Sequence, residues 1–371
     1  MTAAFSAYLD LLRVVAAATV FASHALRPPF ADVAGPWLQD LGHDAVIVFF
    51  VLSGYLVAYA ASERDGALST FTVSRLARLW SVALPALVAT LLLDLAGREI
   101  DPGAYGRSYE YEHWPRYLLF FATMAHEAWF TAEDVFSNVP FWSLSYEAAF
   151  YAIFAGAHFY AGRRALLFAG TAALLAGPKI LLLLPAWLVG AALYRFRDRL
   201  VPGRKAARAM ATLGLGGLVL MKTLHLDVLL NEAVSDALGG LPGQWLRYSR
   251  FAVGDLVMAV LIGLNLLGVR HAGWAPPQPR LRALLKAGAG MTFTLYLFHY
   301  PLLKFLTVLL GAVLPAALLT LLLVPPLAFL TEWRRDWWRR RLWSLFLRGE
   351  ALLARLPALH AALVPSGGRA R

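Results

Sequence analysis

The chain has 371 residues, of which 59% are hydrophobic and 15% are charged. Soluble proteins of this length carry about a quarter charged residues, so the composition predicts a polytopic membrane protein. The absence of cysteine excludes disulfide bonds, a thiolate nucleophile and a cysteine metal site. The formal net charge is +11. Because the basic residues fall in short connections between apolar segments, we attribute them to membrane topology and not to nucleic-acid binding.

Ten apolar segments predict membrane spans, although the fifth and the seventh are short. They cover approximately residues 8–26, 45–61, 77–97, 140–160, 165–177, 180–196, 209–222, 251–270, 287–310 and 312–333. The predicted fold is therefore all-α, a polytopic bundle of about ten transmembrane helices. We expect residues 1–335 to form a single transmembrane domain. Residues 336–371 are expected to form a basic amphipathic cytoplasmic tail, because interleaved Arg and Trp suit an anionic leaflet.

The basic residues also predict the orientation of the chain in the membrane. Bases outnumber acids in alternate connections and in the C-terminal tail, whereas acids outnumber bases in residues 27–44 and 98–139. Cytoplasmic connections are enriched in Lys and Arg, so both termini are expected in the cytoplasm. The apolar segment Tyr117–Ala125 is too short to cross. We interpret it as an interfacial or re-entrant helix, because a crossing there would invert every later connection.

Arg13 and His24 interrupt the first apolar segment. Their separation of eleven positions amounts to about three helical turns, so the two side chains share one face and lie roughly 16 Å apart along the axis. Ionisable residues at membrane depth are costly and by default indicate function. The alternative is that Arg13 extends to the headgroups and that His24 lies at the opposite interface.

Two further features combine ionisable residues with membrane helices. Arg75 and Arg78 share a helix face at the predicted cytoplasmic end of the third span, where they can bind phosphates or simply determine topology. Glu147 lies about two turns into the fourth span, too deep for an inexpensive surface carboxylate. It needs a partner, for which Arg13 or His24 is the natural candidate, and a purely structural salt bridge is an equal alternative.

The remaining polar positions favour packing. Ser53 and Gly54 within the second span are typical of close helix contact. His299 lies at membrane depth beside Pro301, and a histidine packed against a neighbouring backbone carbonyl is the simpler interpretation. Two intramembrane histidines without ligand-like spacing do not predict a metal site.

Five motifs follow one another along the chain. They are Arg13 with His24, VFFVLSGY at 48–55, RLAR at 75–78, FWSLSYEAAFY at 141–151 and TLYLFHYP at 294–301. Each motif alone is weak, but this order over about residues 5–335 resembles the membrane-bound acyltransferase 3 family. Tyr55 and Tyr146 stand where other members often have Phe and Val.

The resemblance implies an integral membrane O-acyltransferase. Such enzymes take an acyl group, usually acetyl, from cytoplasmic acyl-CoA and deliver it to a hydroxyl, commonly of a glycan at or beyond the membrane. It further implies catalytic roles for His24, Arg13 and Glu147 and a CoA-binding role for Arg75 and Arg78. Substrate binding is assigned to Trp142, Ser143, Tyr296 and His299.

In the resulting hypothesis, neutral His24 is the general base towards the acceptor hydroxyl, while Glu147 or Arg13 fixes its tautomer or stabilises charge in the tetrahedral intermediate. A covalent acyl-histidine step is the alternative. Acetyl-CoA is the expected donor, without a metal, and a polysaccharide precursor is the expected acceptor.

The expected location is a bacterial cytoplasmic membrane. Some family members carry a further extracytoplasmic domain after the last span, and we expect none here. Two other functions stay open. One is a secondary transporter or flippase for a lipid-linked sugar or an organic anion, in which intramembrane Arg, His and Glu would form a relay. The other is O-acylation of a small molecule such as a macrolide.

Overall fold

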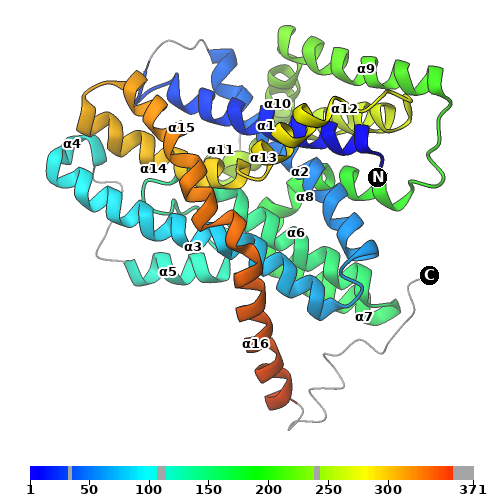
Figure 1. Cartoon of the computed structure of the whole chain (residues 1–371), viewed down its shortest axis with the longest axis horizontal. Coiled ribbons are helices and arrows are strands. Elements are labelled where there is room, and N and C mark those ends of the chain that lie inside the picture. The colour runs from blue at the N-terminus through cyan, green and yellow to red at the C-terminus, as the bar shows by residue number, and fades with distance from the viewer. Residues whose placement is uncertain (32–35, 107–113, 238–242, 354–371) are drawn as a thin grey trace.

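The computed structural model describes residues 1–31, 36–106, 114–237 and 243–353, and within these ranges the fold is helical without a β-strand (Figure 1). The long helices are α1 (Ala3–Ala25), α2 (Pro36–Glu63), α3 (Leu68–Ile100), α6 (Trp142–Phe159), α7 (Gly162–Ala176), α8 (Pro178–Arg195), α9 (Arg204–Thr223), α12 (Ala252–His271), α14 (Thr292–Leu310), α15 (Val313–Leu330) and α16 (Arg335–Leu353). The shorter helices are α4 (Pro102–Tyr105), α5 (Trp114–Thr123), α10 (Leu226–Ala237), α11 (Gly243–Leu246) and α13 (Pro279–Ala289), with 3-10 turns η2 (Val139–Phe141), η3 (Arg247–Phe251) and η4 (Glu332–Arg334). The all-α prediction is confirmed.

Each of the ten predicted spans coincides with a long helix, but fewer helices qualify as membrane spans. By length and hydropathy, seven of the described helices can cross a membrane, or eight if the bent pair α9 and α10 forms one span. The 15 residues of α7 are too few, and Ser143, Ser145 and Glu147 reduce the hydropathy of α6. The predicted count of about ten is therefore not confirmed, and the orientation stays a prediction.

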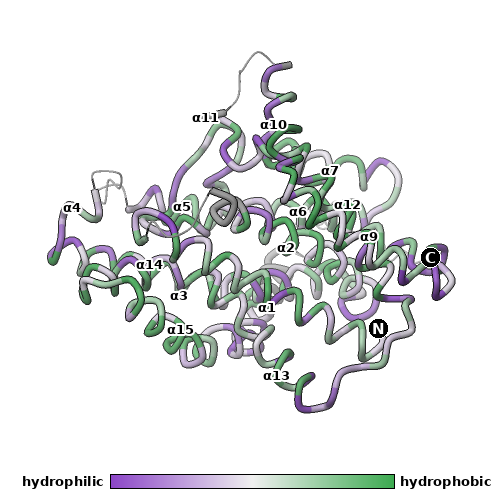
Figure 2. Tube along the Cα trace, turned by 90° about the horizontal axis from the view of Figure 1, so that it is seen from above, coloured by the Kyte–Doolittle hydropathy of each residue, from purple (hydrophilic) through white to green (hydrophobic). Residues whose placement is uncertain are grey.

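Large apolar side chains face outward along the bundle. Leu166 and Leu174 on α7 and Leu314 and Leu322 on α15 are each more than half exposed. Figure 2 shows that the long helices are mostly hydrophobic and that hydrophilic residues concentrate at helix ends and connections. A surface of this kind is costly in water and favourable against lipid chains, so the structure indicates a multi-pass membrane protein.

Helices α2 and α8 cross at two glycines. A Cβ atom added to Gly54 would lie 2.0 Å from the Trp187 carbonyl oxygen, and one added to Gly190 would lie 1.9 Å from the Val51 carbonyl oxygen. Only glycine permits so close an approach of two backbones. The packing role predicted for Gly54 is therefore confirmed, and the crossing fixes the neighbouring Ser53 relative to the interior of the bundle.

The connection before α6 is irregular but buried. Ser137 Oγ and its backbone N–H donate to Asp94 on α3, and the Asn138 amide donates to the Leu297 carbonyl at 2.8 Å. Pro301 lacks the N–H that would bond this carbonyl in a regular helix, so Asn138 supplies the missing donor. This segment is thus held between α3 and α14.

Two segments that the sequence analysis excludes from the spans, the helix near Tyr117–Ala125 and the C-terminal tail, are helical in the structure as far as it describes them. Helix α5 has 10 residues, too few to span, which is consistent with the interpretation of Tyr117–Ala125. Helix α16 packs against α3 and projects from the other helices (Figure 1). Residues 354–371 of the predicted tail lie outside the described residues.

Candidate active site

A narrow cavity of about 70 Å³ gathers most of the predicted ionisable residues. Its polar lining comprises Arg13, Ser53, Arg75, Arg78, Ser143, Glu147, Tyr151, Thr292 and Tyr296. These side chains come from α1, α2, α3, α6 and α14, so the fold brings the five predicted motifs to one place. We call this space the narrow cavity.

A wider cavity of about 620 Å³ lies against the other half of α1. It is lined by Val20, Ser23, His24, Arg27, Gly42, His43, Val46, Val139, Pro140, Trp142, Arg247, Tyr248, Arg250, Phe251 and Tyr296. Helix α1 therefore presents Arg13 to the narrow cavity and His24 to this wide cavity, which is the consequence of placing both residues on one helix face.

Tyr296 and Val46 line both cavities and so mark the boundary between them. The Tyr296 hydroxyl lies 2.8 Å from Ser143 Oγ, within hydrogen-bond distance. On α6, the consecutive residues Trp142 and Ser143 line different cavities, the wide and the narrow one respectively. Three of the four residues assigned to substrate binding thus lie where the two cavities meet.

His24 is oriented by His299. His24 Nδ1 lies 2.9 Å from His299 Nε2, and His299 Nδ1 lies 2.9 Å from the Leu295 carbonyl oxygen. A carbonyl oxygen only accepts, so His299 Nδ1 carries the proton and, in the neutral ring, Nε2 accepts. His24 Nδ1 must then donate. This leaves the lone pair on His24 Nε2 for a proton transfer, the tautomer that a general base needs.

Glu147 has partners other than those predicted. Its Oε1 accepts from Ser53 Oγ at 2.8 Å and from the Tyr151 hydroxyl. Among the ion pairs of the described ranges, none joins Glu147 to Arg13 or His24. The residue that fixes the tautomer of His24 is therefore His299, and not Glu147 or Arg13 as predicted. Glu147 and Arg13 both line the narrow cavity.

His299 itself is fully buried behind His24 and lines neither the narrow nor the wide cavity. The bond to a backbone carbonyl agrees with the simple packing interpretation of this residue. The position of His299 outside both cavity linings does not support the substrate-binding role predicted for it. The geometry assigns His299 to positioning His24.

Comparison with known proteins agrees with the motifs. The family model described as an acyltransferase domain, acyltransferase 3, matches residues 6–333. The chain belongs to the acyltransferase 3 family. It is also similar to the acyltransferase MdmB of Streptomyces mycarofaciens, with 34% identity over 152 residues, which cover 38% of this chain and 36% of that protein. The match thus spans about a third of that relative. No solved structure matches the chain.

Both arginines of the RLAR motif, Arg75 and Arg78, line the narrow cavity. Arg75 Nη2 donates to Asp65 at 3.2 Å and to Ser74 Oγ at 3.0 Å. Its guanidinium also lies 5.6 Å from the centre of the Phe71 ring. These contacts hold Arg75 in place near the cavity, so a phosphate there would meet a pre-oriented cation.

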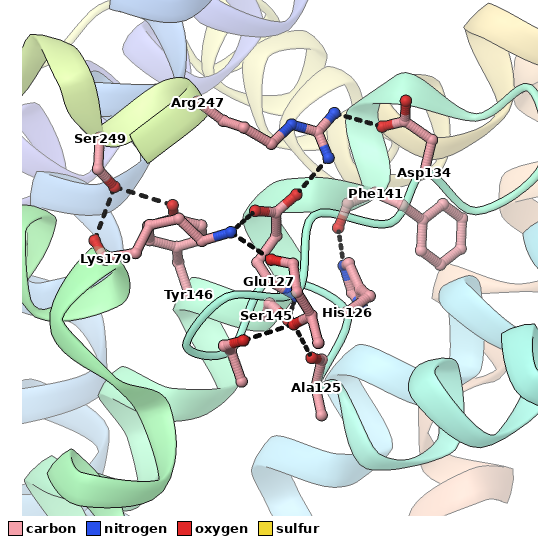
Figure 3. A network of polar contacts seen from close by, with 12 residues as sticks. Ala125, His126, Glu127, Asp134, Phe141, Ser145, Tyr146, Lys179, Arg247 and Ser249 are labelled. Atoms are coloured by element: carbon pink, nitrogen blue, oxygen red, sulfur yellow. Dashed lines mark hydrogen bonds and ion pairs between the residues drawn. The ribbon is translucent and has the colours of Figure 1, made fainter. Parts of the chain in front are cut away.

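One residue that lines the wide cavity, Arg247, belongs to a buried ionic network that the sequence motifs did not predict (Figure 3). Lys179 Nζ lies 2.6 Å from Glu127 Oε2, and both side chains are fully buried. Arg247 Nη1 lies 2.9 Å from Glu127 Oε1, and its Nη2 lies 2.6 Å from Asp134. The network joins three segments distant in sequence. They are the connection after α5, the first turn of α8, and η3.

The network also places an aromatic pair. Arg247 has φ of 45°, a left-handed backbone that is unusual for arginine. The following Tyr248 stacks on Trp142 with ring centres 4.0 Å apart and planes at 10°, and Ser249 Oγ donates to the Lys179 carbonyl (Figure 3). Because Tyr248 and Trp142 line the wide cavity, the network determines its shape.

Burial raises the pKa of Glu127, while the Arg247 and Lys179 cations act in the opposite direction. The sequence offered one signal for this network. Lys179 stands between the apolar segments 165–177 and 180–196, directly before the second, and an ionisable residue so close to membrane depth indicates a partner. The identity of the partner depends on tertiary contacts across more than fifty residues.

Proposed function

We propose that this acyltransferase moves an acyl group, most simply acetyl, from cytoplasmic acyl-CoA to a hydroxyl of a glycan or exopolysaccharide precursor. The observation that carries the proposal is the junction of the two cavities. The narrow cavity offers arginines suited to an anionic donor, and the wide cavity offers His24 beside space for an acceptor. Tyr296 lies between them.

On the donor side, Arg75 and Arg78 would bind the phosphates of CoA. Guanidinium groups bind phosphate oxygens through two parallel, charge-assisted hydrogen bonds. A narrow channel suits the thin pantetheine arm, which carries the thioester towards the boundary residue Tyr296. Arg13, which lines the same cavity, would then lie on the donor side of His24, where its positive charge favours binding of the anionic donor.

On the acceptor side, His24 Nε2 would take the proton of the acceptor hydroxyl as the oxygen attacks the thioester carbonyl carbon. A C–O bond forms, and the carbonyl oxygen carries negative charge in the tetrahedral intermediate. Collapse of the intermediate breaks the C–S bond, and the leaving CoA sulfur accepts the proton from His24. The products are an ester and free CoA, and His24 returns to its neutral form.

His299 has a defined part in this sequence. When His24 becomes an imidazolium, its Nδ1–H continues to donate to His299 Nε2. The ring is therefore held in one orientation through both proton transfers. A second histidine in this place keeps the Nε2 lone pair of His24 free to act on the acceptor hydroxyl.

The proposal is tested by following labelled acetyl-CoA with the purified protein in proteoliposomes. We expect His24-dependent release of CoA, with the label transferred to a hydroxyl-bearing acceptor from a panel that includes oligosaccharides and a macrolide. Movement of an intact lipid-linked sugar or organic anion across the membrane without any binding of acyl-CoA would contradict the proposal. Such a result would favour a transporter.

A further inference from the structure

The wide cavity has a cationic lining. Arg27, Arg247 and Arg250 line it together with His24 and His43, and the lining residues within the described part of the chain include no carboxylate. Cations gathered around a cavity of about 620 Å³ raise the local concentration of anions. Whether they are available to a ligand depends on which of them the protein itself already neutralises.

Two of these cations are neutralised by the fold. Arg247 is paired with both Glu127 and Asp134. His43 Nε2 lies 2.9 Å from Asp255. Each pairing involves a buried or partly buried carboxylate, and each serves the structure of the cavity wall. Neither Arg247 nor His43 therefore contributes an uncompensated positive charge.

Arg27 and Arg250 are different. No ion pair within the described part of the chain joins either of them to a carboxylate. Arg27 follows the C-terminal end of α1, three residues after His24, and Arg250 lies on η3 with its guanidinium 4.5 Å from the centre of the Phe251 ring. The proximity of Arg27 and His24 in sequence places one of these cations beside the catalytic base.

The carboxylates that line a second cavity together with Arg250 do not cancel its charge. Arg250 also lines a neighbouring cavity of about 270 Å³ that contains several carboxylates. Of these, Asp44 and Asp227 are bridged by Lys222, at 2.7 Å and 2.5 Å, and Asp255 is paired with His43. Glu232, the remaining one, is exposed to the surroundings, where solvent screens its charge.

The rest of the wide cavity is aromatic. Trp142, Tyr248, Phe251 and Tyr296 contribute to its lining, and the stack of Tyr248 on Trp142 makes this wall rigid. Flat aromatic surfaces pack against the apolar faces of sugar rings while the polar edges of the rings form hydrogen bonds. The volume lies in the range of sites for small organic ligands.

We propose that the acceptor carries an anionic group, a carboxylate or a phosphate, which Arg27 and Arg250 bind while a neighbouring sugar hydroxyl reaches His24. This inference rests on the proposed function for the identity of the wide cavity as the acceptor site. The inference adds the charge of the acceptor to the proposed function, because that function would be satisfied equally well by a neutral glycan. It also gives a reason for two arginines that have no ion pair among the described residues, on the side of the bundle that the topology prediction assigns to the exterior.

The test compares three matched probes by calorimetry at low salt. The probes are cellobiose, cellobiouronic acid, in which one ring carries a carboxylate, and cellobiose 1-phosphate. We expect at least one anionic probe to bind at least tenfold more tightly than cellobiose, and the difference to shrink as salt is added. The better of the two anionic probes identifies whether the carboxylate or the phosphate is the preferred group.

Variants then locate the contact. R27Q/R250Q should bind all three probes with the affinity of cellobiose, and R27K/R250K should restore part of the difference because the charge remains without the planar fork. The matched control is R116Q, which removes an exposed arginine on α5 that is paired with Glu133. If the double variant unfolds, the single variants and the salt dependence of the wild-type protein carry the test.

Equal affinity for the neutral and anionic probes would overturn the inference. So would an anionic preference that R27Q/R250Q leaves unchanged. The binding of acyl-CoA and the His24-dependent release of CoA are measured on the same preparations. Failure of these two measurements would remove the proposed function, whereas the binding of the probes requires no turnover, so the two failures are distinguishable.

Discussion

His24 and His299 lie 275 positions apart in the sequence, and their Nδ1 and Nε2 atoms are 2.9 Å apart in the fold. Their rings are stacked, with centres 5.0 Å apart and planes at 29°. The Leu295 carbonyl fixes the proton on His299, and His299 in turn fixes the proton on His24. A backbone carbonyl on α14 thereby determines which nitrogen of a side chain on α1 can act as a base.

The first prediction concerns His299. His299→Ala removes the acceptor for His24 Nδ1, so we expect kcat to fall by about 10–100-fold, the usual effect of losing a partner that orients a reactive group. The affinity for acyl-CoA should not change, because His299 does not line the narrow cavity. His299→Gln places a carbonyl oxygen near the former Nε2 and should retain more activity. Equal activity of the wild-type and Ala proteins would exclude the positioning role.

The second prediction concerns His24. His24→Ala should reduce acyl transfer by about 10²–10⁴-fold, because a general base contributes that much to the rate. Thermal unfolding should change little, since the residue borders a cavity and little packing is lost. His158→Ala, at an exposed position near the end of α6, is the matched control and should remain active. A His24→Ala protein that keeps half of its activity would exclude the base assignment.

The sequence predicts the parts of this site that depend on one helix, but not the contacts between helices that are distant in sequence. The 3.6-residue period places Arg13 and His24 on one face of α1, and the composition together with the long apolar segments predicts the all-α membrane class. The sequence points to Glu147 or Arg13 as the partner of His24, whereas the structure places His299 there, because a contact between α1 and α14 depends on how the two helices pack. Glu147 was for the same reason matched with distant charges, although Tyr151, one turn away on α6, is its partner.

Buried polar residues also limit what hydropathy can predict about the spans and the connections. Hydropathy located all ten helices, yet Ser143, Ser145 and Glu147 make α6 more polar than an ordinary span because it carries the site. The Lys179–Glu127–Arg247–Asp134 network was missed because three of its members, Glu127, Asp134 and Arg247, lie in connections, where charged residues are expected to be solvated. Polar residues buried in connections give no periodic signal in the sequence.

The third prediction concerns pH and the connection after α5. Burial lowers the pKa of His126 from 6.5 to about 4, so the folded state favours the neutral ring. The neutral ring stabilises the folded protein above pH 6.5, and this contribution, roughly 3 kcal/mol at most, is lost as the pH falls towards 4. His126→Gln keeps a donor for the Phe141 carbonyl and does not titrate. The Tm of this variant should therefore fall less between pH 7 and pH 4.5 than that of the wild-type protein.

The control for this effect is His225→Gln. His225 is exposed at the turn between α9 and α10, and its substitution should leave the pH dependence of Tm unchanged. Identical pH profiles for the wild-type protein and His126→Gln would show that His126 does not contribute to the acid sensitivity of the fold.

The fourth prediction concerns orientation. A reporter inserted after Gly66, between α2 and α3, should be cytoplasmic, and one inserted after Gly103 should be extracytoplasmic, because bases flank the first connection and acids dominate the second. Gly66 is exposed, and an added Cβ there meets no neighbouring atom, so the position suits an insertion. Both reporters on one side would mean that α3 does not cross the membrane.

The last prediction concerns Arg75 and Arg78 and separates a CoA-dependent enzyme from a transporter. If both bind phosphates, R75A/R78A removes charge-assisted hydrogen bonds worth about 1.5–3 kcal/mol each, and the affinity for acyl-CoA should fall by at least about tenfold. R75K/R78K keeps the charge and the topology but lacks the planar fork, so it should restore binding only in part. If the two arginines serve topology alone, Lys restores everything and Ala misorients α3. Calorimetry with acyl-CoA on both variants decides between these patterns, with the reporter after Gly66 confirming insertion. A correctly inserted R75A/R78A protein with unchanged affinity would remove the donor site from the narrow cavity, and the Asp65 contact of Arg75 would then be structural.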